Sequence, residues 1–364
     1  MKKILSFLAA AAMLFTASCS NDDFDAGDEA VVSFSMNLNG GSSTKSDHII
    51  GKGTLVNKLA YSVFEVKKND AGEVQSVNFL FNDETAVQEW PVILDIRLAK
   101  KKDYKVVFWA QNNSCGAYSL DPATMNVTVS YDGYNNDEAR DAFYKAIDLS
   151  VTGSEKVDVE LKRPFAQLNV GVTAADWNAA VISNAEVTQS EVTISKVANG
   201  INLMNGQVTA ANESVTFQMA NIPVEMLMVE TDPQNEGKEA YYYLSMSYLL
   251  VNDQNTEDGS GPADVSVDFL FQTVSNQIDL NVPVVPVQRN HRTNILGQIL
   301  TGNVTFEIKI DAEFDGNHNI PVTPKEDIVL YDTYAEVYNI EGLMKWCYIV
   351  NNEEGKLGYV MVLS

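Results

Sequence analysis

The chain contains 364 residues, with 49 acidic and 25 basic side chains and a formal net charge of −24. This acidity argues against a nucleic-acid-binding protein, because such proteins need clustered lysine and arginine to replace the counterions of the phosphate backbone. The length exceeds what a single hydrophobic core usually serves, so two domains are expected.

The amino-terminal segment has the layout of a secretory signal. Lys2 and Lys3 provide the positive start, residues 4–15 are apolar apart from one serine, and residues 16–18 are small. The apolar run is shorter than the ~20 residues that cross a membrane as a helix. We therefore predict that residues 1–18 form a signal peptide.

Cys19 follows the small residues directly, and this order resembles a bacterial lipobox. The resemblance implies that the peptide is cut before Cys19 and that this cysteine carries the lipid that anchors the protein. Asp22, Asp23 and Asp25 resemble the export tag of lipoproteins on the outer face of the outer membrane. We assign residues 19–30 as an acidic tether. A free thiol after an ordinary signal peptide is the alternative.

Alternation of apolar and polar residues is the main structural signal in the rest of the chain. It indicates antiparallel strands with one face in the core and the other in water, as in β-sandwiches. The alternating stretches are residues 32–38, 125–131, 157–161, 166–172, 265–269 and 304–311. Within the two sandwiches, short helices are expected at 137–147 and 174–184. The prediction is an all-β fold with minor helix, with two sandwiches in series.

A proline marks the predicted boundary between the two sandwiches. Pro164, in the stretch ELKRPFAQLNV, has no amide hydrogen for a strand ladder and disfavours helix at the residue before it. We assign residues 31–162 to an amino-terminal β-sandwich and residues 163–320 to a carboxyl-terminal β-sandwich.

Residues 321–364 are expected to form a short carboxyl-terminal α/β extension. Pro321 and Pro324 punctuate its start. Apolar residues recur at helical spacing over 339–350, behind an asparagine of the type that caps helices. KLGYVMVLS, residues 356–364, then has the apolar character of a last strand. The sequence leaves the role of this extension open.

Cys115 and Cys347 are the other cysteines of the chain. In an exported protein they are candidates for a disulfide. The sequence does not establish the Cα separation of about 5.5 Å that a bridge needs, so the paired and the free state both stay open.

No constellation in the sequence predicts catalysis. His48, His291 and His318 are scattered among turn-like or strand-edge segments, and no nucleophile elbow, zinc-protease motif or phosphate-binding glycine loop occurs. The turns at 132–138 and 315–319 hold oxygen ligands without the spacing of an EF-hand. We predict a protein that is not an enzyme, with no cofactor and no metal.

Three stretches together resemble the fimbrillin superfamily, the subunits of type V pili in Bacteroidales, in a less characterised branch. They are VVSFSMNL with the following TKSDHIIGKGTLVNKLAYSVFE, then LKRPFAQLNVGVT, and VPVVPVQRNHRTNILGQILTGNVTFEIKID. The resemblance implies two tandem transthyretin-like β-sandwich domains, a lipid-anchored place on the outer-membrane surface or in a fimbrium, and assembly by β-strand exchange. The implied partners are the outer membrane, through the lipid on Cys19, and other fimbrial subunits.

The resemblance also assigns a leaving strand. In the family a protease cuts the loop after the first strand, that strand leaves, and a strand of a neighbouring subunit fills the groove. Here the strand corresponds to residues 31–38, and its apolar face consists of Val32, Phe34, Met36 and Leu38. The alternative is an ordinary first strand in an intact sandwich.

The corresponding cleavage point is Lys45–Ser46, in the glycine- and serine-rich stretch GGSSTKSDH. Family members often carry arginine there. The donor strand of the family comes from the carboxyl-terminal end, and GYVMVLS, residues 358–364, has the apolar character of a donor. A terminal core strand is the alternative for this segment. Whether the chain is a stalk, tip or anchor subunit, whether it polymerises, and which receptor or glycan it binds, stay open.

A surface glycan-binding lipoprotein of a polysaccharide-uptake system is the alternative function. It would share the anchor and the sandwiches, and Trp90, Trp109, Trp177 and Trp346 are candidates for stacking on sugars. The four tryptophans are dispersed, and Trp109 lies in KVVFWA, which predicts a core strand. We therefore place the fimbrial-subunit-like role first and glycan binding second.

Overall fold

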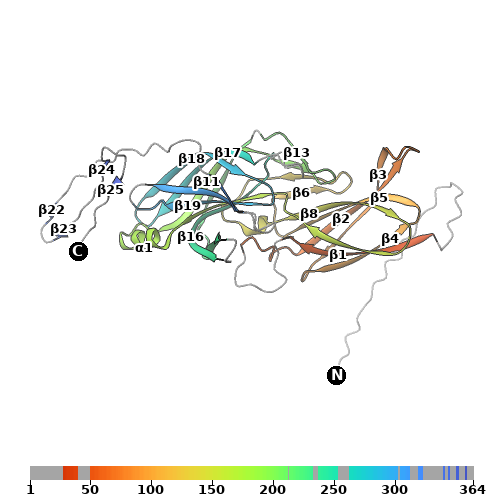
Figure 1. Cartoon of the computed structure of the whole chain (residues 1–364), viewed down its shortest axis with the longest axis horizontal. Helices are drawn as coiled ribbons and strands as arrows, with labels where there is room; N and C mark the ends of the chain where they lie inside the picture. Colours follow the sequence, from red (N-terminus) through yellow and green to blue (C-terminus); the bar gives the residue numbers. More distant parts are fainter. Residues whose placement is uncertain are drawn as a thin grey trace, which may run out of the picture.

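The computed structural model describes residues 28–39, 50–211, 213–232, 237–252, 262–301 and 304–311, with short segments at 319–322, 339–340, 343–344, 350–351 and 357–358. Strands dominate these residues, and one short α-helix accompanies them (Figure 1). The predicted all-β class is confirmed. Among the described residues, no helix has the length and apolar character needed to span a membrane.

The amino-terminal half of the chain forms a three-stranded and a four-stranded sheet over one core. The first sheet has the order β4 (Val92–Ala99), β1 (Glu29–Leu38) and β9 (Glu155–Leu161). The second has the order β3 (Val74–Ala86), β2 (Lys58–Lys68), β5 (Lys102–Gln111) and β8 (Phe143–Val151). Inward side chains of both sheets share this core, in which the rings of Phe34 and Phe108 meet edge to face at 5.2 Å.

The carboxyl-terminal half forms a six-stranded and a four-stranded sheet. The six-stranded order is β15 (Met226–Asp232), β16 (Gly237–Leu249), β10 (Ala166–Val172), β19 (Arg292–Gln298), β20 (Thr305–Asp311) and β21 (Asn319–Val322). The four-stranded order is β14 (Glu213–Asn221), β11 (Val187–Val197), β17 (Ala263–Thr273) and β18 (Gln277–Val287). Buried aliphatic and aromatic side chains from both sheets form the larger core of the molecule.

A third, small sheet joins the two halves. Its order is β13 (Gln207–Val208), β12 (Gly200–Asn202), β7 (Asn126–Val129) and β6 (Tyr118–Asp121). The larger core likewise takes in Trp109 and Val127 from the amino-terminal half. In Figure 1 the strands β1 to β5 lie at one end, the strands β11, β17, β18 and β19 at the other, and β6 and β13 between them. The two halves therefore pack against each other through continuous apolar contact.

Of the two helices predicted within the sandwiches, one is confirmed and one is wrong. α1 (Ala174–Ile182) matches the prediction at 174–184, and its N-cap Thr173 accepts a hydrogen bond from the amide of Asp176. At 137–147 only the 3₁₀ turn η1 (Glu138–Arg140) is helical, and β8 begins at Phe143. The reason is that residues 143–151 pair with β5 along their length, and this pairing overrides a weak helical pattern.

The helix predicted over 339–350 is also absent where that segment is described. β22 (Asn339–Ile340) pairs with β23 (Leu343–Met344), and β24 (Val350–Asn351) pairs with β25 (Leu357–Gly358). A spacing of three residues brings apolar side chains together on a helix and also across a two-residue hairpin, so the spacing alone did not decide between them.

Candidate functional site

The first strand lies in a groove between two neighbours. β1 pairs antiparallel with β4 from Glu29 to Met36 and parallel with β9 from Val32 to Leu38. Because both of its edges carry ladder hydrogen bonds, removal of β1 would expose one strand edge on each side of the groove.

The four apolar residues predicted on the face of this strand all point into the core. Val32, Phe34 and Met36 have no exposed surface and Leu38 is 8% exposed, whereas Asn37 is exposed. Burying a side chain of this kind stabilises a fold by about 1.5–3 kcal/mol, so the four together contribute about 6–12 kcal/mol. That equals the whole stability of a typical domain, and an empty groove would need another strand.

Directly after Leu38 the chain enters a buried polar cluster, which we call the clasp: Asn39, Asp141, Arg163 and Asn290. Arg163 forms a bidentate ion pair with Asp141, with Nε–Oδ1 and Nη2–Oδ2 distances of 2.7 and 2.9 Å. The two side chains are 0% and 1% exposed. The guanidinium also lies over the ring of Phe143, 4.2 Å from its centroid. This bidentate geometry fixes the direction of the remaining arginine donors.

The clasp holds both ends of the segment 40–49. Arg163 Nη1 donates to the carbonyl oxygen of Asn39 at 2.8 Å, and Nη2 donates to that of Gly51 at 3.1 Å. Asp141 Oδ2 accepts from the amide of Gly53 at 3.1 Å. Asn290 Oδ1 accepts from the amide of Arg163, and its Nδ2 donates to Asn39 Oδ1 at 3.2 Å. The residues on either side of the predicted processing segment are thus tied to one buried arginine.

Arg292 and Glu138 support the Gly51 side of the clasp. Arg292 Nη2 donates to the Gly51 carbonyl at 3.2 Å, and Glu138 Oε1 accepts from the Gly51 amide at 2.7 Å. Burial, and then the charge of Asp141, raise the pKa of Glu138 well above its ordinary value. Gly51 has φ +67°, and a Cβ there would lie 2.1 Å from Arg292 Nη2. A residue with a Cβ would displace the end of the Arg292 side chain and would strain the positive φ, so this position favours glycine.

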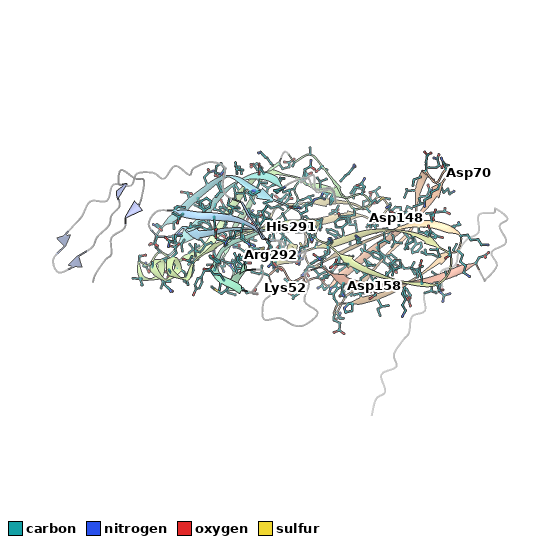
Figure 2. The ribbon with its side chains drawn as sticks, in the orientation of Figure 1. Lys52, Asp70, Asp148, Asp158, His291 and Arg292 are labelled. Carbon is teal, nitrogen blue, oxygen red and sulfur yellow. The ribbon has the colours of Figure 1, made fainter. Side chains whose placement is uncertain are left out.

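Figure 2 places this region near the middle of the molecule: Arg292 and Lys52 lie close together there, with His291 beside them. Asp70, by contrast, stands at the tip of the hairpin between β2 and β3, far from the clasp. The clasp is therefore a feature of the junction between the two halves.

Two of the three sequence stretches that carried the resemblance supply the polar residues behind the clasp. β10, from RPFAQLNV, and β19, from RTNILG, lie side by side as parallel strands. Asn169 Nδ2 donates to Asn294 Oδ1 at 2.8 Å, and Gln167 Nε2 donates to Tyr248 Oη at 2.9 Å. The expectation that one face of 166–172 lies in water is wrong, because every residue of β10 is buried. Its polar face is covered, and these bonds satisfy part of it, whereas Asn169 Oδ1 and Asn294 Nδ2 are buried without a hydrogen-bond partner.

Several predicted residues lie outside the described part of the chain. They are Cys19, Lys45, Ser46, His48, His318, Trp346 and Cys347. Cys115 is a buried free thiol, and burial raises its pKa. His291 is half-buried, and its Nδ1 lies 2.9 Å from the carbonyl oxygen of Arg289.

The described tryptophans pack against protein rather than gather on a surface. Trp109 is 1% exposed, as predicted for a core strand. Trp177 stacks on Tyr242 at 4.8 Å between ring centroids, and Trp90 is half-buried against the smaller core. In the turn 132–138, Asn135 Nδ2 donates to Ser190 and Ser245. Within the described residues no group of three or more His, Cys, Asp or Glu side chains could hold a metal.

Sequence reasoning missed Asp141, Glu138 and Asn290 as members of this site. Arg163 carried the one usable signal, as the charged residue that opens the motif RPFAQLNV. Its partners lie 22 positions before it and 127 positions after it, so no local pattern connects them.

A family model described as "Family of unknown function (DUF6562)" matches residues 25–341. Comparison with the curated proteins gives no match. Among solved structures the chain is similar to a fimbrial assembly protein from Parabacteroides distasonis, with 12% identity, a TM-score of 0.40, and coverage of 81% of this chain and 100% of that one. It is also similar to the fimbrial anchor protein Mfa2 from Porphyromonas gingivalis, with 13% identity, a TM-score of 0.34, and coverage of 78% and 98%.

A candidate adhesin from Bacteroides thetaiotaomicron is a further structural neighbour, with 10% identity, a TM-score of 0.44, and coverage of 83% and 100%. The structural neighbours therefore include fimbrial proteins of Bacteroidales.

Proposed function

We propose a function for this chain, which belongs to the DUF6562 family of unknown function, from its own geometry: it is a non-catalytic, fimbrial-subunit-like surface lipoprotein that assembles by exchange of β1. The observation that carries the proposal is the position of β1, which fills an apolar groove between β4 and β9 and is followed directly by the segment 40–49. One cut in that segment would leave β1 bound to its groove by non-covalent contacts alone.

After such a cut, β1 can be replaced by an incoming strand, so that its contacts with the groove are exchanged for equivalent contacts and are not simply lost. The groove would lose about 6–12 kcal/mol of apolar burial and two rows of ladder hydrogen bonds, which an incoming strand of the same pattern would restore. We place the cut at Lys45–Ser46, following the sequence prediction. Backbone edges and apolar pockets make all of these contacts, so the role needs no cofactor.

Residues 357–364 are the donor that we propose, supplied by a second copy of the chain. Their sequence LGYVMVLS follows the order of VSFSMNLN at 32–39 position by position. Leu357, Tyr359, Met361 and Leu363 correspond to Val32, Phe34, Met36 and Leu38. An aromatic, a methionine and a leucine thus recur at the same period-two spacing, so the same pockets would accept them.

Cleavage and assembly are tested together on cells. We expect the parent and a Lys67→Ala control, changed at an exposed position of β2, to yield a mature form that begins at Ser46 and surface filaments that bind antibody. Lys45→Ala should retain the residues before Ser46 and form no filaments. A parent protein that begins only at acylated Cys19, with no labelled filaments, would contradict the assembling role.

Lipid attachment is tested separately with a fatty-acid analogue. We expect Cys19→Ala to lose the label and the membrane attachment, because this thiol is the proposed lipid acceptor. Equal labelling of variant and parent would refute the lipoprotein assignment. Retention of the protein on an immobilised glycan panel, without filaments, would favour the alternative glycan-binding role.

A further inference from the structure

We propose that the clasp residues other than Asn39, which are Asp141, Arg163 and Asn290, form a binding site that helps to set the register of the strand in the β1 groove. Its ligand is an extended segment in which an asparagine follows directly after the last of four alternating apolar residues. This inference rests on the strand exchange proposed above and adds a preference that the apolar pockets do not impose. β1 meets this preference through Asn39, whereas the proposed donor 357–364 has Ser364 at the same place and would bind without the carboxamide contacts.

Every hydrogen-bonding group of Asn39 has a partner outside β1. Its amide donates to the carbonyl of Leu161 at 2.8 Å, and its carbonyl accepts from Arg163. Its side-chain Nδ2 donates to Glu160 Oε1 at 2.8 Å, and its Oδ1 accepts from Asn290 Nδ2. Asn39 is only 7% exposed. One side-chain donor and one side-chain acceptor are therefore both used, which is the signature of a carboxamide.

Other side chains would not satisfy this position. An aspartate would direct a carboxylate at the carboxylate of Glu160, and an alanine or leucine would leave the buried Nδ2 of Asn290 without its partner. Leaving a buried donor without an acceptor destabilises the complex by more than the net free energy that the hydrogen bond contributes. The site therefore discriminates by chemistry as well as by shape.

The apolar pockets alone cannot fix the register fully. A shift of one residue turns every apolar side chain to the wrong face and is excluded. A shift of two residues keeps the faces. In one direction it places Gly41 at the clasp, which has no side chain for Asn290 or Glu160. In the other direction it places Asn37 there, which keeps an asparagine at the clasp but puts Ala30 in the pocket of Val32. The clasp therefore disfavours the first register by its polar contacts, and the apolar pockets disfavour the second.

The clasp is held in place without help from β1. Arg163 is fixed by Asp141, by the Gly51 carbonyl and by the ring of Phe143, all of which lie after residue 49. Asn290 is fixed by the amide of Arg163 and by its own amide, which donates to the carbonyl of Phe165 at 2.9 Å. The receptor groups would therefore keep their geometry when the strand changes, which favours binding.

The test uses the full chain with a sequence-specific protease site placed within residues 41–48. After cleavage, a fluorescent peptide of residues 28–39 is added, and its uptake is competed with unlabelled peptides. We expect Asn39→Ala to compete about 10- to 100-fold less well than the parent, as the loss of two buried hydrogen bonds implies. The matched control Asn37→Ala, at an exposed position of the same strand, should stay within about threefold of the parent.

Two further measurements separate a register effect from a general loss of contact. In the chain with Asn290→Ala, the difference between the parent and the Asn39→Ala peptide should shrink, because one of the two side-chain partners of Asn39 is gone and only Glu160 remains. A peptide with Ser33→Cys should form a disulfide with Asp95→Cys in the parent register, since these residues face each other. With Asn39→Ala added, the bond should move to Ile93→Cys, two positions along β4.

The outcomes distinguish this inference from the proposed function. If the labelled parent peptide never enters the groove, strand exchange fails and the register site fails with it. If it enters, but Asn39→Ala competes as well as the parent and keeps its disulfide at position 95, the exchange stands and the register site is refuted.

Discussion

Arg163→Met is the substitution that tests the clasp most directly. Methionine has a similar length but no charge and no donors, so it leaves Asp141 as a buried carboxylate that has lost its bidentate partner. Breaking a buried ion pair from one side destabilises a protein by about 3–5 kcal/mol. The carbonyls of Asn39 and Gly51 lose a donor in the same step, so we expect the upper part of that range.

The second variant separates lost charge pairing from lost packing. In the double variant Asp141→Asn with Arg163→Met, no uncompensated carboxylate remains, and we expect recovery of about 1–3 kcal/mol relative to Arg163→Met alone. Arg97→Met, at an exposed position of β4, is the control and should change stability by less than about 0.5 kcal/mol.

The assay is urea unfolding of the purified chain, followed by fluorescence and by far-UV circular dichroism. Coincident transitions would justify a single free energy of unfolding. A loss below about 1 kcal/mol for Arg163→Met, or strictly additive effects of the two substitutions, would refute the description of the clasp as a buried, mutually dependent pair.

Three further substitutions examine neighbouring features. Because the pKa of Glu138 is raised in the folded protein, the folded form keeps a proton that the unfolded form has lost above the ordinary glutamate pKa of about 4.3. The free energy of unfolding should therefore fall as the pH rises above that value, by up to about 1.4 kcal/mol per pH unit. Glu138→Gln should remove this fall, and an unchanged pH profile of this variant in urea unfolding would contradict the argument. Phe34→Ala should destabilise by about 3–5 kcal/mol, against less than about 0.5 for Ile93→Ala, whose side chain is 73% exposed; equal effects would contradict the burial of β1. Gly51→Ala should lower the thermal midpoint more than Gly72→Ala, because both have positive φ but only Gly51 would place a Cβ against Arg292; equal midpoints would refute the steric argument.

The strands were predictable because their signal is local. Val32, Phe34 and Met36 alternate with polar residues, and each strand of this kind buries one face whatever its partners are. The same reasoning failed for β10, where Gln167 and Asn169 alternate with apolar residues and are nevertheless buried. Alternation indicates which face of a strand is apolar and which is polar. It does not predict whether polar partners from distant strands cover the polar face.

The clasp could not be predicted from the sequence, for a different reason. Asn39, Asp141 and Asn290 belong to three separate turns, and their distances from Arg163 in the chain follow no period. Which asparagine or aspartate meets the arginine depends on the register of β10 with β19 and of β1 with β9, and a sequence without partners does not determine either.

The apolar groove and the clasp make different contributions to the binding of β1: the groove contributes affinity and the clasp contributes register. Apolar pockets supply most of the affinity, and they accept strands with the right alternation. A buried ion pair contributes little net stability compared with apolar residues of the same volume, and its best-attested use is to specify register. In this protein the pair lies where the last groove residue meets the turn, and it directs one fixed donor at Asn39. Replacing the clasp by apolar residues should therefore keep the groove strand bound while it loses its unique position.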